Sequence, residues 1–205
     1  VSVLPKTIRT FSALLLALAL GACATMSPEE CRFANWTDVG MRDGLEGRTM
    51  ALFNERVSDC AEAGVRVDGN AYLKGRDSGL QSYCRLENAV PLGLNGGRYE
   101  GVCPAQIDGE FRRRYQLGYN VYAAHAEAAP LDNRMQWLEQ RLRQIDRDED
   151  RRLRDANKED DRRRIRRDAD DERHRVRDEL RDLDRAQFRA REAVRYAEWM
   201  LTSVR

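Results

Sequence analysis

Two stretches of the chain, Gly40-Met-Arg-Asp-Gly44-Leu and Gly75-Arg-Asp-Ser-Gly79-Leu, place two glycines four residues apart directly before a leucine. In a helix, residues four apart lie on the same face, so each stretch predicts a helix with a bare stripe. Such a stripe admits a second backbone at close range, although each glycine costs about 1 kcal/mol relative to alanine. An aromatic residue precedes each stretch, and Tyr115-Gln-Leu-Gly118-Tyr is a weaker third copy. We therefore predict three short helices that pack through glycine faces, and the shared pattern also admits a short internal duplication.

The stretch between the second and third predicted helices, residues 91–104, is rich in turn signals. Asn95-Gly96-Gly97 is the strongest of them, and Cys84 and Cys103 flank the stretch. This pattern predicts a short β-hairpin or an extended loop. An isolated ribbon of this length has marginal stability, so the flanking cysteines are expected to support it.

The chain has five cysteines, and four of them fall within one segment: Cys31, Cys60, Cys84 and Cys103. An even number of cysteines in a small exported domain predicts two disulfides, with three connectivities open. A zinc site would need a short C-x₂₋₄-C spacing or a nearby histidine, and the segment has neither. We therefore expect neither a metal nor another cofactor.

The fifth cysteine, Cys23, follows a segment that resembles a bacterial lipoprotein signal. Lys6 and Arg9 precede an apolar run that ends in Leu20-Gly21-Ala22-Cys23, which looks like a lipobox. The apolar run is shorter than the roughly 20 residues that a membrane-spanning helix needs. We therefore expect residues 1–22 to be a signal peptide, Cys23 to carry lipid, and residues 23–30 to form a linker. In lipoproteins of this type an Asp after the lipidated cysteine retains the protein in the inner membrane. Ala24 stands there, so we expect the outer membrane and its periplasmic face.

The remaining sequence divides into a small stapled domain, residues 31–129, and a charged tail, residues 130–205, with Pro130 as the boundary. The last 75 residues contain 22 basic and 20 acidic side chains, with apolar residues in the four-and-three rhythm of a coiled coil. The fold class is therefore mainly α, with a long charged helix after the domain. A straight helix is favoured over a folded hairpin. It would need a partner to cover its apolar stripe, either a second copy of the chain or an envelope protein, through Leu180, Leu183, Val194 and Leu201.

Few features of the sequence point to catalysis. No nucleophile with a general base can be assembled around His125 or His174. The formal net charge of +1 argues separately against a nucleic-acid partner. Asp43 and Asp77 occupy matched positions and could form a carboxylate pair that acts on a sugar. Helix capping or pairing with neighbouring arginines is the favoured role for both. The expectation is therefore that the protein is not an enzyme.

Taken together, four groups of residues resemble the bacterial lipoprotein family known as domain of unknown function 2799. The groups are Trp36-x₃-Gly40-x₂-Asp43-Gly44-x₂-Gly47, Tyr72-x₂-Gly75-x₃-Gly79-Leu80-x₂-Tyr83-Cys84, Gly93-x₂-Gly96-x₂-Tyr99-x₃-Cys103-Pro104 and Phe111-x₃-Tyr115-x₂-Gly118. The resemblance implies a small exported lipoprotein domain without an established activity, so it assigns no catalytic residue.

These observations predict an outer-membrane lipoprotein with a structural or adaptor role carried by its coiled-coil tail. The alternative is an envelope protein that binds peptidoglycan or processes glycan through the glycine-rich domain.

Overall fold

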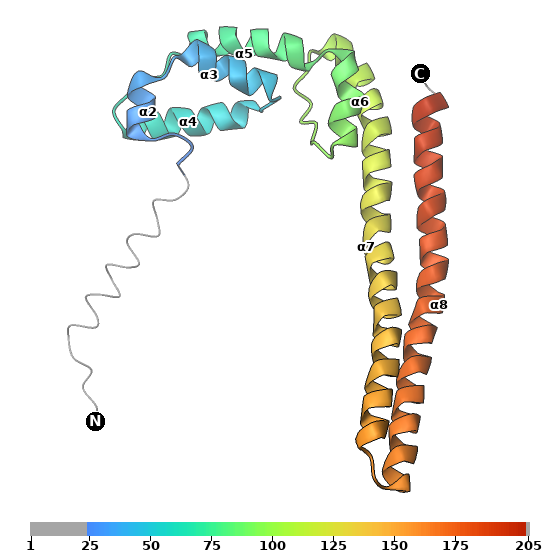
Figure 1. Ribbon diagram of the computed structural model, residues 1–205. Helices are drawn as coiled ribbons and strands as arrows, with labels where there is room; N and C mark the ends of the chain where they lie inside the picture. The colour runs from blue at the N-terminus through green and yellow to red at the C-terminus, as the bar shows by residue number, and fades with distance from the viewer. Residues whose placement is uncertain (1–23, 204–205) are drawn as a thin grey trace, which may run out of the picture. The chain divides into compact units, whose positions relative to one another are not determined.

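The computed structural model describes residues 24–203, which contain seven helices and no strand (Figure 1). The predicted signal peptide, the predicted lipidation site Cys23 and the last heptad residue Val204 lie outside the described residues. The mainly α fold class is confirmed. The helices are α2 (Pro28–Phe33), α3 (Trp36–Leu45), α4 (Met50–Glu62), α5 (Gly69–Tyr83), α6 (Leu86–Leu94), α7 (Ala105–Asp155) and α8 (Glu159–Ser203).

The described chain divides into two compact units. Unit 1 contains residues up to Arg85 together with Tyr99–Gly109, and unit 2 contains Leu86–Arg98 together with the chain from Glu110 onward.

Pro130 lies inside α7 and does not end a helix. Proline removes the hydrogen bond to the carbonyl of Ala126. Both residues are exposed, so water reaches that carbonyl and the helix continues.

In unit 1, the two glycine stretches bring α3 and α5 into direct backbone contact. A Cβ at Gly44 would lie 2.3 Å from the carbonyl oxygen of Arg76, and a Cβ at Gly79 would lie 2.3 Å from that of Met41. Gly40 and Gly75 meet the opposite backbone even more closely. No side chain fits between the helices at these positions. The predicted glycine-faced helix contact is therefore confirmed.

In unit 2, α6 and α7 meet in the same way. A Cβ at Gly93 would lie 2.3 Å from the carbonyl oxygen of Tyr115, and a Cβ at Gly118 would lie 2.3 Å from that of Val90. The stretch predicted as a β-hairpin or loop therefore forms α6 and a loop, and the hairpin alternative is wrong. Asn95-Gly96-Gly97 follows the end of α6. A glycine with left-handed backbone is found after helix C-termini as well as in the turns of β-hairpins, so the same residues fit both structures.

The two contacts belong to a repeated motif. At Gly47 and at Gly96 the backbone is left-handed, with φ values of 65° and 69°. Each glycine follows its helix in a Schellman turn closed by matching hydrogen bonds, Arg48 N–H to the Asp43 carbonyl and Gly97 N–H to the Leu92 carbonyl, both 2.9 Å. A tyrosine ring covers each turn, Tyr83 in unit 1 and Tyr122 in unit 2.

Residues 40–47 therefore correspond to residues 89–96, and residues 72–83 correspond to residues 111–122. In this duplication α3 corresponds to α6, and α5 corresponds to the first part of α7. The glycine pattern in the sequence had instead suggested that α3 corresponds to α5. The first copy differs from the second by a longer connection, which contains α4. This added helix is the element that carries the polar groups described below.

Two disulfides staple unit 1, as predicted, and the structure settles their connectivity. Cys31 pairs with Cys60, and Cys84 pairs with Cys103. The first joins α2 to α4 and belongs to a buried cluster with Trp36 and Tyr72. Closing a loop of this size stabilises a fold by roughly 3 kcal/mol, which matters in a unit with so small a core.

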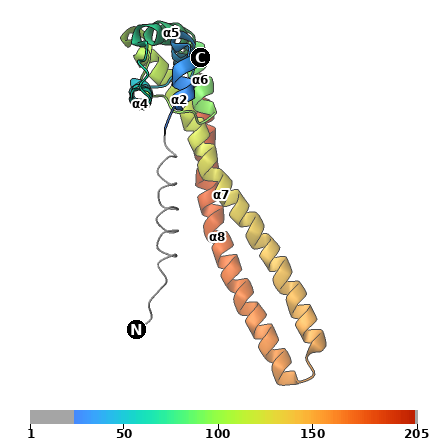
Figure 2. The same cartoon turned by 90° about the vertical axis from the view of Figure 1, so that its left-hand side faces the viewer.

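In unit 2, α7 and α8 form an antiparallel hairpin and lie side by side in both views (Figures 1 and 2). The straight helix favoured from the sequence is therefore wrong. The two apolar stripes cover each other through a core of Leu138, Ile145, Ala169 and Val176. The chain turns after Asp155, where the guanidinium of Arg162 donates to the carbonyl oxygen of Leu153 at 2.7 Å and caps the end of α7.

Polar contacts between the helices fix the register of this hairpin. Arg173 pairs with Glu149 at 2.7 Å and with Asp146 at 3.0 Å, and Arg134 pairs with Glu179 at 2.7 Å. Gln187 lies buried at a seam position and donates to Asp132. A polar group at such a position selects one alignment over its alternatives. Within α8, Asp160 and Asp161 pair with the arginines three residues ahead of them, Arg163 and Arg164.

The helix contact predicts a sharp difference between two glycines. In Gly44→Ala the new methyl group meets the backbone of α5, which cannot move aside, so we expect the free energy of unfolding to fall by about 2–3 kcal/mol. Denaturant unfolding measures this change.

Gly109→Ala is the matched control. A Cβ at Gly109 meets nothing within 4 Å, so this helical substitution should leave stability unchanged or raise it by about 0.5 kcal/mol. Equal effects of the two substitutions would contradict the assigned contact.

Candidate functional site

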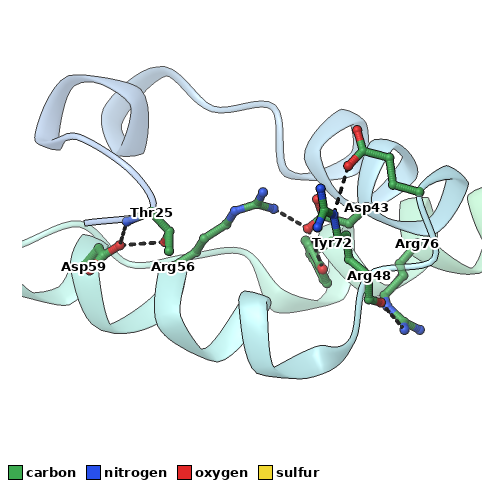
Figure 3. Close-up of polar contacts among 8 residues, drawn as sticks. Thr25, Asp43, Arg48, Arg56, Asp59, Tyr72 and Arg76 are labelled. Carbon is green, nitrogen blue, oxygen red and sulfur yellow. Dashed lines mark hydrogen bonds and ion pairs between the residues drawn. The ribbon is translucent and has the colours of Figure 1, made fainter. Parts of the chain in front are cut away.

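The most enclosed polar group of unit 1 is the carboxylate of Asp43 on α3, with only 2% of the residue exposed (Figure 3). The hydroxyl of Tyr72 on α5 donates to Asp43 Oδ2 at 2.8 Å. The guanidinium of Arg56 on α4 forms an ion pair with the same oxygen. One carboxylate therefore connects three helices.

The Tyr72 hydroxyl is held in its protonated, donating form. Burial raises its pKa well above the ordinary value, and the hydrogen bond to Asp43 raises that pKa further. Its ring stacks on Phe53 of α4 with the centroids 4.0 Å apart. Tyr72 therefore fixes Asp43 with its hydroxyl and fixes α4 with its ring.

A second arginine, Arg76 of α5, extends the network. Its Nη2 donates to the carbonyl oxygen of Arg48 at 2.9 Å, just after the end of α3. The Nε atoms of Arg56 and Arg76 are buried and make no hydrogen bond within the described part of the chain. The groups around Asp43 thus bind one another, and this arrangement suits the fixing of α4 better than it suits proton transfer to a substrate.

The second copy of the motif supports this interpretation. Leu92 occupies the position of Asp43, and Phe111 occupies that of Tyr72. Both polar partners are thus replaced together by apolar residues in the copy that lacks the added helix. The network accordingly accompanies α4 and is not a requirement of the glycine contact.

A carboxylate of α4 holds the start of the described chain. Asp59 Oδ2 accepts hydrogen bonds from the backbone N–H and the hydroxyl of Thr25, both at 2.6 Å, and from the N–H of Met26 at 3.2 Å (Figure 3). The Thr25 hydroxyl is the main cause that lowers the pKa of Asp59 below its ordinary value. These three hydrogen bonds to Asp59, which we call the clasp, are therefore formed at neutral pH. They weaken only as the pH falls through that lowered pKa.

The carboxylate pair suggested by the sequence is not formed as such. Asp43 is buried with Arg56 and Tyr72 as partners, whereas Asp77 is exposed on α5. Neither aspartate caps the start of α3, which is capped by Asn35, whose side chain accepts from the N–H of Thr37 at 3.1 Å. The sequence analysis found Asp43 but missed Arg56, because 13 residues of sequence separate these partners.

The two histidines, and two arginines near the start of α7, have partners within the fold. Nε2 of His125 on α7 lies 3.1 Å from Glu198 of α8, and Nδ1 of the exposed His174 lies 2.8 Å from the carbonyl oxygen of Asp170. Arg113 and Arg114 both bind Glu110, which lowers the pKa of that carboxyl to about 2.

The leucines predicted to bind a partner face the inside of the hairpin. Leu180 and Leu183 pack against its core, and Val194 and Leu201 are half-buried at heptad spacing from them. The opposite face of α8 instead exposes three aromatic residues that the sequence analysis overlooked: Phe188 (65% exposed), Tyr196 (63%) and Trp199 (59%). Their spacing in the printed sequence already places them away from the heptad leucines.

Among residues 24–203, no helix combines the length and the apolar character needed to cross a bilayer. The same residues contain no cluster of three side chains suited to hold a metal ion.

Comparison with known proteins identifies one family. The model of the family described as "Protein of unknown function (DUF2799)" matches residues 35–120. The resemblance to this domain of unknown function is thus confirmed for this segment, which includes α3 to α6 and the first part of α7, and the lipoprotein character stays a prediction. No curated protein and no solved structure matches the chain.

The Asp43 network predicts a large effect from a small change. Asp43→Ala removes the common partner of Arg56 and Tyr72, so we expect the free energy of unfolding to fall by about 3 kcal/mol. The exposed control Asp77→Ala should change it by less than about 0.5 kcal/mol. Denaturant unfolding of the two variants measures both.

A triple variant tests whether the loss of stability comes from leaving buried polar partners unpaired. Asp43→Leu, Tyr72→Phe and Arg56→Met remove all the partners together and should recover at least half of the loss. A wild-type stability for Asp43→Ala would show that the network contributes nothing.

Proposed function

We propose that this protein is a non-enzymatic outer-membrane lipoprotein, anchored through Cys23, that serves as a structural or adaptor protein through its helical hairpin. The lipobox-like Leu20-Gly21-Ala22-Cys23 supports the anchor, and Ala24 after it supports the outer membrane. The two disulfides support an oxidising compartment such as the periplasm. The mutual pairing around Asp43 supports a structural role for the glycine-rich unit.

One observation carries the adaptor role. α8 packs one face against α7 and presents aromatic side chains on the opposite face, where no element of unit 2 covers them. Exposed aromatic residues grouped on one face are typical of protein interfaces. The leucine stripe of α8, which was predicted to need a partner, is covered by α7. We therefore place the partner-binding surface on the outer face of the hairpin.

The pattern of this outer face suits a second copy of the chain. Phe188, Glu192, Arg195 and Trp199 follow one another at spacings of four, three and four, so they form a single stripe, the aromatic stripe. An antiparallel pair that sets Phe188 opposite the partner's Trp199 also sets Glu192 opposite the partner's Arg195. A two-fold axis makes each contact twice, so the stripe is complementary to itself in charge, and Glu192 and Arg195, which pair with each other within one copy, could exchange partners across the axis.

Cross-linking in living cells tests this pairing. With a photoreactive amino acid at position 188 or 199 and two differently tagged copies of the chain, we expect a cross-link between the two tags. Arg177 is the matched control, because it is exposed on the same face 11 residues before Phe188. In the proposed alignment it lies outside the paired segment from Phe188 to Trp199, so it should give a much lower yield of cross-link.

Two results would contradict the pairing. A cross-link from positions 188 and 199 to a different protein would replace the second copy by that partner. A protein that stays monomeric at high concentration in sedimentation, with no cross-link at either position, would overturn the adaptor role itself.

Mass spectrometry of the membrane fraction tests the anchor separately. We expect the first peptide of the mature protein to begin at Cys23 and to carry two or three acyl chains. Cys23→Ala should abolish the acylation and release the protein from the membrane. An unmodified chain that keeps residues 1–22, or one found free in the soluble fraction, would overturn the localisation.

A further inference from the structure

The stem that leads from Cys23 into unit 1 is fixed to the fold. Asp59 accepts all three hydrogen bonds from Thr25 and Met26, and Ser27 and Glu30 close a capping box that begins α2. The disulfide between Cys31 and Cys60 then joins α2 to α4, one residue after Asp59. Residues 24–30, expected to be a linker, are thus bound at both ends in the described part of the chain.

This stem leaves little distance between a lipid on Cys23 and the folded unit. The predicted lipidation site precedes Thr25 by two residues, and two residues of chain span at most about 7 Å in any conformation. A protein on a flexible tether samples many orientations above a bilayer, whereas a clasped stem restricts them. The same face of unit 1 should therefore stay close to the lipid.

The surface beside the stem carries an exposed apolar side chain. Phe33, the last residue of α2, is 81% exposed, which is the largest value for any big apolar side chain of the described residues. It borders a groove of about 380 Å³ that is lined by four apolar residues, Met26, Phe33, Ala34 and Val39, and by four polar ones, Glu30, Asn35, Asp38 and Arg42. Met26 thus belongs to both the clasp and the groove.

The charge beside the stem does not attract anionic lipid. Residues 24–42 contain three acidic and two basic side chains. Contact with a bilayer would therefore come from apolar insertion and not from headgroup charge, so it should not depend on salt. One phenylalanine binds a bilayer weakly when alone, but an anchor a few residues away makes its insertion an intramolecular event.

We propose that the Phe33 face of unit 1, formed by Met26, Phe33 and the groove beside them, rests on the phospholipid surface that holds Cys23. The clasp on Asp59 sets this orientation, and Phe33 enters the interface between headgroups and acyl chains. This inference rests on the proposed lipid anchor.

Photo-cross-linking of the full-length protein in its own membrane tests the orientation. A photoreactive phenylalanine analogue at position 33 should become attached to phospholipid, as seen by mass spectrometry of the peptide that carries it. The matched control is position 73, where Leu73 is 43% exposed on α5 of the same unit. We expect at least a fivefold higher yield of phospholipid adduct at position 33, at both low and high salt.

The clasp is tested in the same experiment by two substitutions outside the core. Asp59→Ala removes all three acceptor bonds, and Thr25→Val removes one of them. Both should keep the protein in the membrane through Cys23, with adducts at position 33 lowered severalfold by Asp59→Ala and less by Thr25→Val. An unchanged yield in both variants would overturn the orienting role of the clasp.

The mass of the Cys23 peptide, measured in the same samples, separates the two proposals. If Cys23 is acylated but position 33 gives no phospholipid adduct, or no more than position 73, the inferred face is wrong and the anchor stands. An adduct with the chain's own acylated N-terminus would mean that the groove holds an acyl chain, and an adduct with protein would mean a protein contact. Either result would overturn the inference, and an unmodified Cys23 would overturn the anchor as well.

Discussion

The fold of unit 1 depends on the direct contact between the backbones of α3 and α5. With no side chains between them at Gly40, Gly44, Gly75 and Gly79, the helices approach until a Cβ would overlap the opposing carbonyl oxygens. This closeness brings Asp43 of α3 within 2.8 Å of Tyr72 on α5. Arg56 and the ring of Phe53 then attach α4 to the same two residues. The position of Asp59, and with it the stem, follows from this chain of contacts.

The duplicated motif shows which parts of this arrangement are separable. In the second copy, Gly93 and Gly118 make the helix contact, while Leu92 and Phe111 stand where Asp43 and Tyr72 stand in the first. A buried ion pair adds little net stability over apolar residues of similar size, so its presence calls for a local reason. That reason is α4, which only the first copy contains. The polar network therefore reads as an attachment for an added helix, built on a contact that is stable without it.

Much of this architecture could be predicted from local patterns. The glycine spacing predicted the helix contacts, and four cysteines without metal-site spacing predicted two disulfides. The sequence did not determine which helices pair, because G-x-x-x-G is the same signal in α3 and α5. The turn between α7 and α8 did leave a trace: the heptads before Ile145 and after Val176 are out of phase. A phase shift marks a break in a stripe, but either a turn or a local change of helix winding produces one. Arg56 and the Asp59 clasp could not be predicted, because their partners are 13 and 34 residues away.

The structure also changes where an interaction of this protein is expected. An isolated charged helix would have to use its leucine stripe to bind a partner. Because α7 covers that stripe, the remaining apolar surface of α8 is its row of exposed aromatic residues. Two residues of opposite charge, Glu192 and Arg195, lie within this row, three residues apart. The spacings of this row are the same in both directions, and reversing it sets each aromatic residue opposite an aromatic residue and each charge opposite the other sign, which favours an antiparallel copy of itself over an unrelated surface. The covered stripe holds the two helices of the hairpin together, and under the proposed function the exposed stripe is the surface that a second copy binds.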